Sequence, residues 1–362
     1  MAIYKGNKKV VAVYKGSTPY NKIYKGSTLV FQKSGGGGST HLIEGTATGN
    51  FDIYINGNSI PITIDADGKW FYDTDEKITS LVYAFFNVTA VTSVDLSNLD
   101  LTGISTSSMF EETPNITSIK FNNTKSMKLV DVYSMFMGCS SLTSINISSF
   151  DTSSLTGADS LFNGCASLKT LDLSSFDTSS LTSAANLFSD CKSLVSLDLS
   201  NWNTNNLTSA TSLFSGCSSL TSINLSSFNT SKLREISSLF MGCSKLVSLD
   251  LKSFDTSNIT HAANLFMGCS KLVSLDLSSF DTSSLTSAYN LFRGCTSLET
   301  LDLSNFDMSK AKYYNDIFEN CTSLSTIKCK QAFKDWCITN QDTIKLPDTM
   351  REGGSGTWEI VG

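Results

Sequence analysis

The stretch GCSSLTSINLSSFNT, residues 216–230, belongs to a repeat with a period of 26 residues. Phenylalanine recurs at this period from Phe136 to Phe318, and leucine from Leu142 to Leu324. Cysteine follows the same spacing at Cys139, Cys165, Cys191, Cys217, Cys243, Cys269, Cys295 and Cys321. A fixed period of this length indicates a solenoid, in which each repeat forms one coil.

One repeat predicts the path of a coil. Residues 168–176, LKTLDLSSF, have the apolar spacing L-x-x-L-x-L-x-x-F of a leucine-rich repeat. Leu171 and Leu173 should point inward from a short strand, because side chains alternate along a strand. Asp177 should begin an Asx turn. Residues 182–191 should begin with a hydroxyl cap and continue as a short helical turn.

Stacked coils predict one parallel sheet with strands about 4.8 Å apart. Its ten expected strand centres are Val94, Ile119, Ile145, Leu171, Leu197, Ile223, Leu249, Leu275, Leu301 and Ile327. The predicted fold class is therefore an α/β repeat solenoid of the leucine-rich-repeat type, with a 26-residue period, a parallel β-sheet face, short helical turns and small β-rich segments at its N-terminus.

The repeated cysteines are predicted to be reduced core residues. Neighbours in register would lie about 4.8 Å apart with parallel Cβ vectors, whereas a disulfide needs Cβ atoms about 3.8 Å apart and directed at each other. Zinc ligands must converge, and these thiols run in a line. Cys329 should also be core, and a bridge between Cys329 and Cys337 remains open as an alternative. We expect no metal and no cofactor.

Composition shifts divide the chain into five segments. Residues 1–33 form a β-rich arm of YKG repeats, and 34–40 form a Gly-rich flexible linker. Residues 41–80 are expected to be a β-meander that caps the solenoid of residues 81–331, because terminal units must cover exposed core. Residues 332–362 should form a C-terminal cap in which TWEIV adds a last strand. The candidate assembly residues of the arm are Tyr4, Tyr14, Tyr24, Gly6, Gly16 and Gly26.

Charge is unevenly distributed along the chain. Residues 1–33 contain seven lysines and no acidic residue, so the net charge of −6 leaves −13 for the remainder. Seven spaced lysines without arginine favour a solvated strand surface over a nucleic-acid site. The N-terminus has no apolar signal core, and no run approaches the roughly 18 apolar residues of a membrane span. We expect no nucleic-acid partner, no membrane insertion and no Sec export.

The candidate ligand face combines two columns of outward residues on the predicted sheet. The acidic and amide column contains Asn146, Asp172, Asp198, Asn224, Asp250, Asp276 and Asp302, and the hydroxyl column contains Ser144, Thr170, Ser196, Ser222, Ser248 and Ser274. Carboxylates about 4.8 Å apart repel one another, which predicts raised pKa values or bound cations. We favour the other interpretation, in which neighbouring Ser and Thr side chains hydrogen-bond them in water. The face is repetitive, which fits either a repetitive polymer ligand such as a glycan or a passive spacer.

The residue pattern does not indicate an enzyme. The two histidines, His41 and His261, belong to no zinc motif, and the chain has no nucleophile elbow, P-loop or dinucleotide fingerprint. No catalytic residues are therefore expected.

Two resemblances suggest a function. The run MFMGCSSLTSINISSFDTSSL, residues 135–155, and its successors resemble BspA-like leucine-rich-repeat proteins of bacterial surfaces over about 81–331. This implies adhesion or host contact. The YKG repeats of the arm resemble N-terminal segments of phage and prophage tail or fibre proteins.

Together these resemblances imply a non-enzymatic phage virion fibre or receptor-binding adhesion protein. Its expected partners are further copies or a virion protein through residues 1–33, and a bacterial cell-surface protein or glycan through the body. The expected location is the virion, with the bacterial cell surface as the alternative. The alternative functions are a structural virion decoration or spacer, and a bacterial cell-surface leucine-rich-repeat adhesin.

Overall fold

The computed structural model describes residues 42–74 and 76–361 and, before them, the backbone of four short strands. The predicted linker 34–40 lies outside the described residues. The first strands are β1 Tyr14–Lys15, β2 Thr18–Pro19, β3 Lys22–Lys25, β4 Thr28–Gln32, β5 Ile43–Ala47, β6 Phe51–Ile55, β7 Asn58–Ile62 and β8 Lys69–Tyr72. The coils contribute β9 Val91–Leu96, β10 Ser118–Phe121, β11 Met127–Lys128, β12 Phe150–Asp151, β13 Ser196–Asp198, β14 Ser222–Asn224, β15 Ser274–Asp276, β16 Thr300–Leu303 and β17 Thr326–Lys330. The chain ends with helix α1 Gln331–Thr339, the 3-10 turn η1 Asp348–Met350 and β18 Thr357–Val361.

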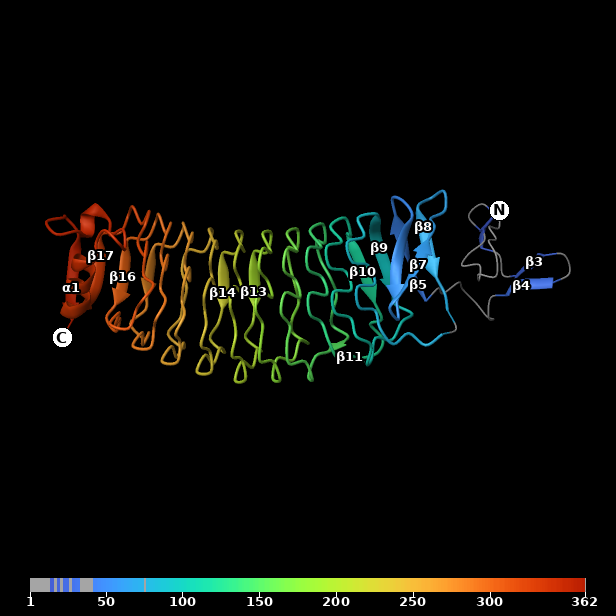
Figure 1. Cartoon of the computed structure of the whole chain (residues 1–362), viewed down its shortest axis with the longest axis horizontal. Coiled ribbons are helices and arrows are strands. Elements are labelled where there is room, and N and C mark those ends of the chain that lie inside the picture. Colours follow the sequence, from blue (N-terminus) through green and yellow to red (C-terminus); the bar gives the residue numbers. More distant parts are fainter. Residues whose placement is uncertain are drawn as a thin grey trace.

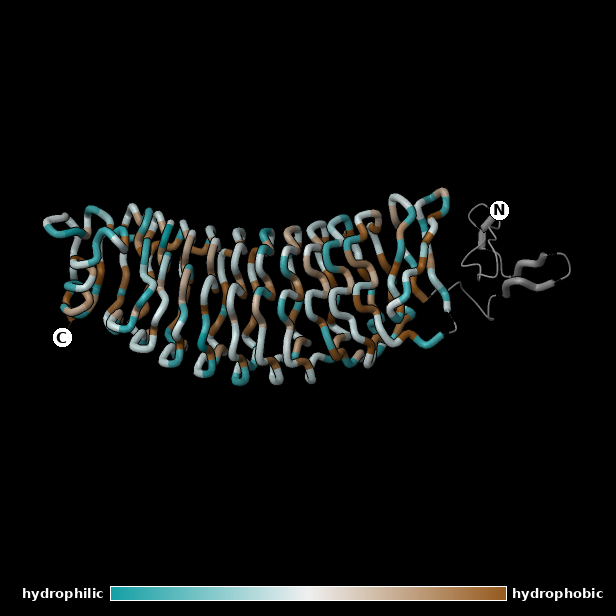
Figure 2. The backbone as a smooth tube through the Cα atoms, in the orientation of Figure 1, coloured by the Kyte–Doolittle hydropathy of each residue, from teal (hydrophilic) through white to brown (hydrophobic). Residues whose placement is uncertain are grey.

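The body is an elongated, gently curved solenoid (Figure 1). Each coil repeats the same path, so that hydrophobic and hydrophilic segments recur along the stack (Figure 2). Strands from successive coils pair in parallel at equivalent positions, as Leu197 does with Ile223 and Leu301 with Ile327. The predicted fold class, a leucine-rich-repeat solenoid with a parallel sheet face, is confirmed.

The core is built from columns of identical side chains. Phe188, Phe214 and Phe240 are fully buried, and their rings stack with centroids 6.0 and 5.8 Å apart. All ten cysteines are free and buried, including Cys329 and Cys337, so the alternative bridge between these two is absent. The prediction of reduced core thiols is therefore confirmed.

The predicted helical turn is wrong. Residues 182–191 form successive turns, and alternate backbone N–H groups bond to the next coil, as Phe188 N does to Leu213 O at 3.0 Å. Asn186 and Asp190 have φ of 56° in the left-handed region. A turn of type II requires positive φ at its third residue, and such residues interrupt a right-handed helix. The only α-helix in the described residues is α1.

The parallel sheet is less continuous than predicted. The coils around Ile145, Leu171 and Leu249 make no regular ladder, and β13, β14 and β15 are three residues long. A strand of three residues makes few ladder bonds. The aromatic rings beside the sheet stack at wider spacings, such as 6.4 Å between Phe176 and Trp202, than the roughly 4.8 Å between paired strands. Side-chain columns of this kind connect neighbouring coils where the ladder is interrupted.

The N-terminal cap is not the simple meander that was predicted. β6 and β7 form a hairpin through Asn56 and Gly57, but β8 pairs with β5, which pairs in turn with β9. β5 was not foreseen. It packs closely because Gly45 has no side chain: a Cβ there would lie 1.9 Å from the carbonyl oxygen of Ser93. The loop between β7 and β8 lets β8 leave the hairpin and join this sheet.

At the C-terminal end, α1 packs Phe333 and Cys337 into the core. β18 then returns to the sheet and pairs in parallel with β17. TWEIV therefore forms the last strand, as the sequence predicts. The end of the stack is thus covered partly by α1 and partly by a single strand.

Candidate ligand-binding face

The two predicted columns lie on the outer surface of the strand side. Ser196 and Asp198 pair in register with Ser222 and Asn224 of the next coil. The exposed members of the hydroxyl column are Ser144, Thr170, Ser196, Ser222, Ser248 and Ser274, and those of the acidic and amide column are Asn146, Asp172, Asp198, Asn224, Asp250 and Asp276. Asp302 is half-buried. We call this surface the strand face.

Each acidic or amide side chain of the strand face is held by its own coil. Oδ1 of Asp198 accepts a hydrogen bond from the backbone N–H of Ser200 at 3.0 Å. The same bond forms at Asn146, Asp172, Asn224, Asp250, Asp276 and Asp302, with lengths of 2.9 to 3.1 Å. This Asx geometry holds the side chain in one orientation, so a ligand would meet a largely ordered surface.

These hydrogen bonds favour the interpretation in which neighbouring hydroxyl groups bond the carboxylates, and they oppose raised pKa values. The pKa of Asp172 and that of Asp198 lie below the ordinary value of 3.8, because the backbone N–H and the hydroxyl of the serine two residues later stabilise the carboxylate. The pKa of Asp276 is lowered too, first by the hydroxyl of Ser278. Hydrogen bonding to the charged form outweighs repulsion between coils, because water screens these exposed charges.

Lysines pair with acidic side chains at three places along the strand side of the solenoid. Lys120 lies 3.4 Å from Asp95, and Nζ of Lys328 lies 2.8 Å from Oδ2 of Asp302. Lys252 approaches Asp276 at 3.9 Å. Among the described residues, the carboxylates of the column that make no such ion pair are Asp172, Asp198 and Asp250.

A second surface varies from coil to coil. Residues at the positions Gly157, Ser183, Ser209, Glu235, His261, Ser287 and Tyr313 form a ladder of parallel bridges along the turn segments. Glu235 and His261 are exposed and lie 3.9 Å apart. Tyr289 and Tyr313 are exposed as well. Sequence reasoning treated His261 only as an enzyme candidate, although aligning the repeats by column would have identified this variable surface.

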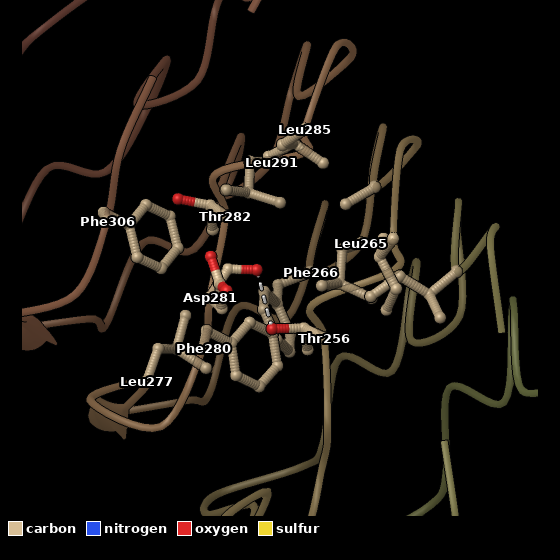
Figure 3. Close-up of a pocket in the computed structure, with 13 residues that line it drawn as sticks. Thr256, Leu265, Phe266, Leu277, Phe280, Asp281, Thr282, Leu285, Leu291 and Phe306 are labelled. Carbon is tan, nitrogen blue, oxygen red and sulfur yellow. Dashed lines mark hydrogen bonds between the residues drawn. The ribbon is translucent and has the colours of Figure 1, made fainter. Parts of the chain in front are cut away.

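A small cavity lies in the described part of the solenoid. The cavity is about 20 Å³ in volume and lies between coils among apolar side chains such as Leu265, Phe280 and Leu291 (Figure 3). The hydroxyl of Thr256 at its margin already donates to the carbonyl oxygen of Asp281 at 2.9 Å. An apolar space of this size is a packing gap, since a bound water needs two or more polar partners.

Several other predicted features lie partly or wholly outside the described residues. Of the candidate arm residues, Tyr14 falls in β1 and Tyr24 in β3, whereas Tyr4, Gly6, Gly16 and Gly26 are outside the described set. Across 42–74 and 76–361, no three His, Cys, Asp or Glu side chains are grouped so that they could hold a metal ion. No helix among the described residues is long and apolar enough to cross a bilayer.

A family model described as "Mycoplasma protein of unknown function, DUF285" matches this chain over residues 79–194, 104–223, 130–249, 161–272 and 235–345. These overlapping matches together run from residue 79 to residue 345. A search of curated proteins found no match.

Solved structures of repeat proteins are similar to the chain. A leucine-rich repeat protein from Bacteroides ovatus is 17% identical, with 84% of this chain and 91% of that chain covered and a TM-score of 0.43. A leucine rich cell surface protein from Faecalibacterium prausnitzii is 18% identical, with 76% and 94% covered and a TM-score of 0.29. The functional domain of InlJ from Listeria monocytogenes, described as including a cysteine ladder, is 19% identical, with 70% and 63% covered and a TM-score of 0.14.

Proposed function

The chain belongs to the family described as Mycoplasma protein of unknown function, DUF285, and from this premise we propose that it is a non-enzymatic adhesion protein whose strand face binds a repetitive polymer on a cell surface. The observation that carries the proposal is the repetition of one ordered polar unit. Each such unit consists of a hydroxyl, as in Ser196, and an anchored carboxylate or amide, as in Asp198.

The spacing of these units suits an extended ligand. Paired strands of successive coils place equivalent groups about 4.8 Å apart. A ligand with a similar repeat can make the same contact in every coil, so weak single contacts add up to firm binding. A compact ligand with one distinctive shape would gain nothing from identical groups in successive coils. The proposed ligand is therefore a polymer such as a glycan.

The negative charge of the strand face restricts the class of polymer that it is proposed to bind. The strand face carries Asp172, Asp198, Asp250 and Asp276, all exposed, and the chain beyond residue 33 has a net charge of −13 when the seven arm lysines are subtracted from the total of −6. Complementary charge favours encounter and like charge opposes it. We therefore propose a neutral or amino-bearing polysaccharide and not an anionic polymer.

The solenoid offers a matched control for testing this face. A second column, with Asp177, Asp255 and Asp281, is exposed elsewhere on the coil and makes the same Asx bond to the residue two positions later. Both columns contain asparagine in other coils, at Asn224 and Asn229. Asp-to-Asn changes therefore preserve the local turn in either column and differ only in the face whose charge they remove.

The experiment compares the triple variant Asp198→Asn, Asp250→Asn, Asp276→Asn with the triple variant Asp177→Asn, Asp255→Asn, Asp281→Asn. Both full-length proteins and the unsubstituted chain are tested on an array of neutral, amino-bearing and anionic bacterial polysaccharides. We expect a neutral or amino-bearing polymer to bind the unsubstituted chain and the second variant alike, and the first variant at least tenfold more weakly. Absence of binding to every polymer, or equal loss in both variants, would contradict the proposal.

Two locations are compatible with this proposed adhesion protein. The resemblance of the repeats to BspA-like proteins supports a bacterial cell surface, and the resemblance of the YKG arm supports a virion. We favour the cell surface, because the BspA-like resemblance extends over about 81–331, whereas the resemblance to phage proteins is confined to the arm, residues 1–33. An antibody against the body should label intact cells of the source strain; labelling confined to purified phage particles would favour the virion instead.

A further inference from the structure

The sheet has an open edge at the C-terminal end of the solenoid. β18 pairs with β17 on one side, and no other strand in the described part of the chain pairs with it. An unpaired strand edge presents free N–H and C=O groups that another chain can use. β18 is therefore a candidate acceptor for an added strand.

A core column of the repeat also continues to this edge, and its last side chain is not covered there. Ile360 lies in register with Cys329, which lies in register with Leu303. Leu303 and Cys329 are 0% exposed, whereas Ile360 is 46% exposed. Ile360 thus occupies a core position of the repeat and yet faces outward from the end of the stack. A terminal repeat normally presents a polar outer surface.

At the opposite end of the solenoid, the apolar side chains are covered. Trp70 is 2% exposed and packs edge-on against Phe51 with ring centroids 5.2 Å apart. Ile53 and Ile62 of the β6–β7 hairpin are buried beside them. At the C-terminal end, α1 buries Phe333 but leaves Ile360 exposed. β8 is the edge strand of its sheet there, but its apolar side chains are buried. Of these two edge strands, only β18 leaves an apolar residue in a core column of the repeat exposed.

Residues 1–33 have the features of a donor for this edge. In the described backbone, β1 pairs with β2 and β3 pairs with β4, as two-stranded ribbons. A single hairpin is marginally stable in water unless it packs on more structure. The sequence of β4 has Leu29 and Phe31 two residues apart, the same spacing as Trp358 and Ile360. An added strand with this pattern can continue two core columns.

The charges of the arm and of the region around β18 are also complementary. The arm contains seven lysines and no acid, with Lys22 and Lys25 at the ends of β3. β18 carries the exposed Glu359, and Glu352 just before it is exposed too. Opposite charges favour encounter between the two segments. Two copies of β18 paired antiparallel about their centres would instead place Glu359 opposite Glu359, which is unfavourable.

The strand β4 of a chain cannot reach the open edge of the same chain. The ten residues between β4 and β5 span at most about 35 Å when fully extended. β5 pairs with β9, and the stacked positions from there to β18 measure roughly 50 Å at about 4.8 Å each. The donor and the acceptor must therefore belong to different copies.

We propose that the protein assembles head to tail, with residues 1–33 of one copy adding strands to the open edge of β18 of a second copy. Ile360 is then covered by an apolar residue of the arm. Because donor and acceptor are different surfaces, a pair of copies keeps one free arm and one free edge. Such a contact is heterologous and gives open filaments, or rings if the rotation closes. An array of this kind would join successive strand faces into a longer surface.

The test uses full-length variants and measures solution mass by sedimentation and light scattering over a concentration series. Ile360→Lys removes the acceptor, and Phe31→Asp removes the donor. Val247→Lys is the matched control, because Val247 is 53% exposed but lies in an internal coil. We expect concentration-dependent oligomers for the unsubstituted chain and the control, and monomers for Ile360→Lys and Phe31→Asp.

Mixing the two defective variants decides between head-to-tail contact and association of arms with each other. Ile360→Lys still has its arm, and Phe31→Asp still has its edge, so the mixture should yield dimers and nothing larger. Recovery of dimers also shows that both variants are folded. Unchanged oligomers of Ile360→Lys, a monomeric unsubstituted chain, or a mixture that stays monomeric would each overturn the proposal. The readout is mass and not polymer binding, so its failure leaves the proposed function untouched.

Discussion

The thiol of Cys217 donates a hydrogen bond to the carbonyl oxygen of Phe188, with 3.1 Å between Sγ and O. Phe188 lies one coil earlier, 29 residues back in the chain. The same bond recurs from Cys139 to Cys321 with lengths of 3.0 to 3.2 Å. The cysteine column therefore fills the core and also ties each coil to the previous one.

The first prediction concerns thiol reactivity. Burial raises the pKa of Cys217 to about 12, and the thiolate is the reactive form. We expect iodoacetamide to leave the repeat cysteines of the native protein unmodified at neutral pH and to modify all ten in denaturant. Peptide mass spectrometry gives the extent at each site. Rapid labelling of Cys217 in the folded protein would show that the column is not buried in solution.

The second prediction concerns the aromatic column. Phe214 is fully buried between Phe188 and Phe240, so Phe214→Ala should lower the free energy of unfolding by about 3 to 5 kcal/mol, as the loss of buried aromatic side chains does. Asp198→Asn should change it by less than about 0.5 kcal/mol, because the site is exposed and Asn224 occupies the equivalent position. Urea denaturation measures both. Equal effects of the two changes would contradict the assignment of Phe214 to the inside and Asp198 to the outside of the solenoid.

The third prediction tests the turns that replace the expected helix. Gly268 has φ of +77° and room for a Cβ, whose nearest neighbour would be 3.5 Å away. Gly268→Ala should therefore destabilise the protein through backbone strain alone, by about 1 to 2 kcal/mol. Gly268→Asn should cost less, because asparagine tolerates this conformation and Asn320 holds the equivalent position with φ of 61°. If alanine and asparagine were equally costly, crowding and not φ would explain the glycine.

The fourth prediction follows from the lowered pKa values of Asp172, Asp198 and Asp276. A carboxyl whose pKa is lower in the folded state contributes stability that is fully present above its ordinary value of 3.8 and is lost as pH falls through the folded value. Thermal unfolding should therefore show little pH dependence from these groups near neutrality and a falling melting temperature in acid. The variant with all three changed to Asn should lose less on acidification; an identical acid response would assign the loss to other groups.

The fifth prediction separates a binding face from a spacer. Removing residues 192–243 deletes two coils in register. Cys191 is then followed by Ser244, just as Cys243 is followed by Ser244 in the unsubstituted chain. The shortened chain should fold, since each coil contacts mainly its neighbours, and circular dichroism can verify this. If the strand face binds a polymer, affinity should fall as contacts are lost. Unchanged attachment would favour the spacer.

The sequence by itself was sufficient for the stack, its period and its core. Phe188, Cys191 and Leu194 repeat every 26 residues, and only stacked coils place such residues in continuous buried columns. The strand face could also be predicted, because alternation along a strand directs Asp198 outward when Leu197 and Leu199 point inward. These inferences depend on local spacing, which the chain carries in every repeat.

The tertiary structure decided the features that depend on contacts between coils. Thr178 has a polar side chain and is buried, because its hydroxyl bonds to the carbonyl oxygen of Asn203 at 3.1 Å and accepts from the N–H of the same residue at 2.8 Å. The turns, the pairing of β8 with β5 and the exposure of Ile360 likewise depend on which backbone groups find partners in a neighbouring coil. Backbone groups are the same in every residue, so the pattern of side chains does not reveal their partners.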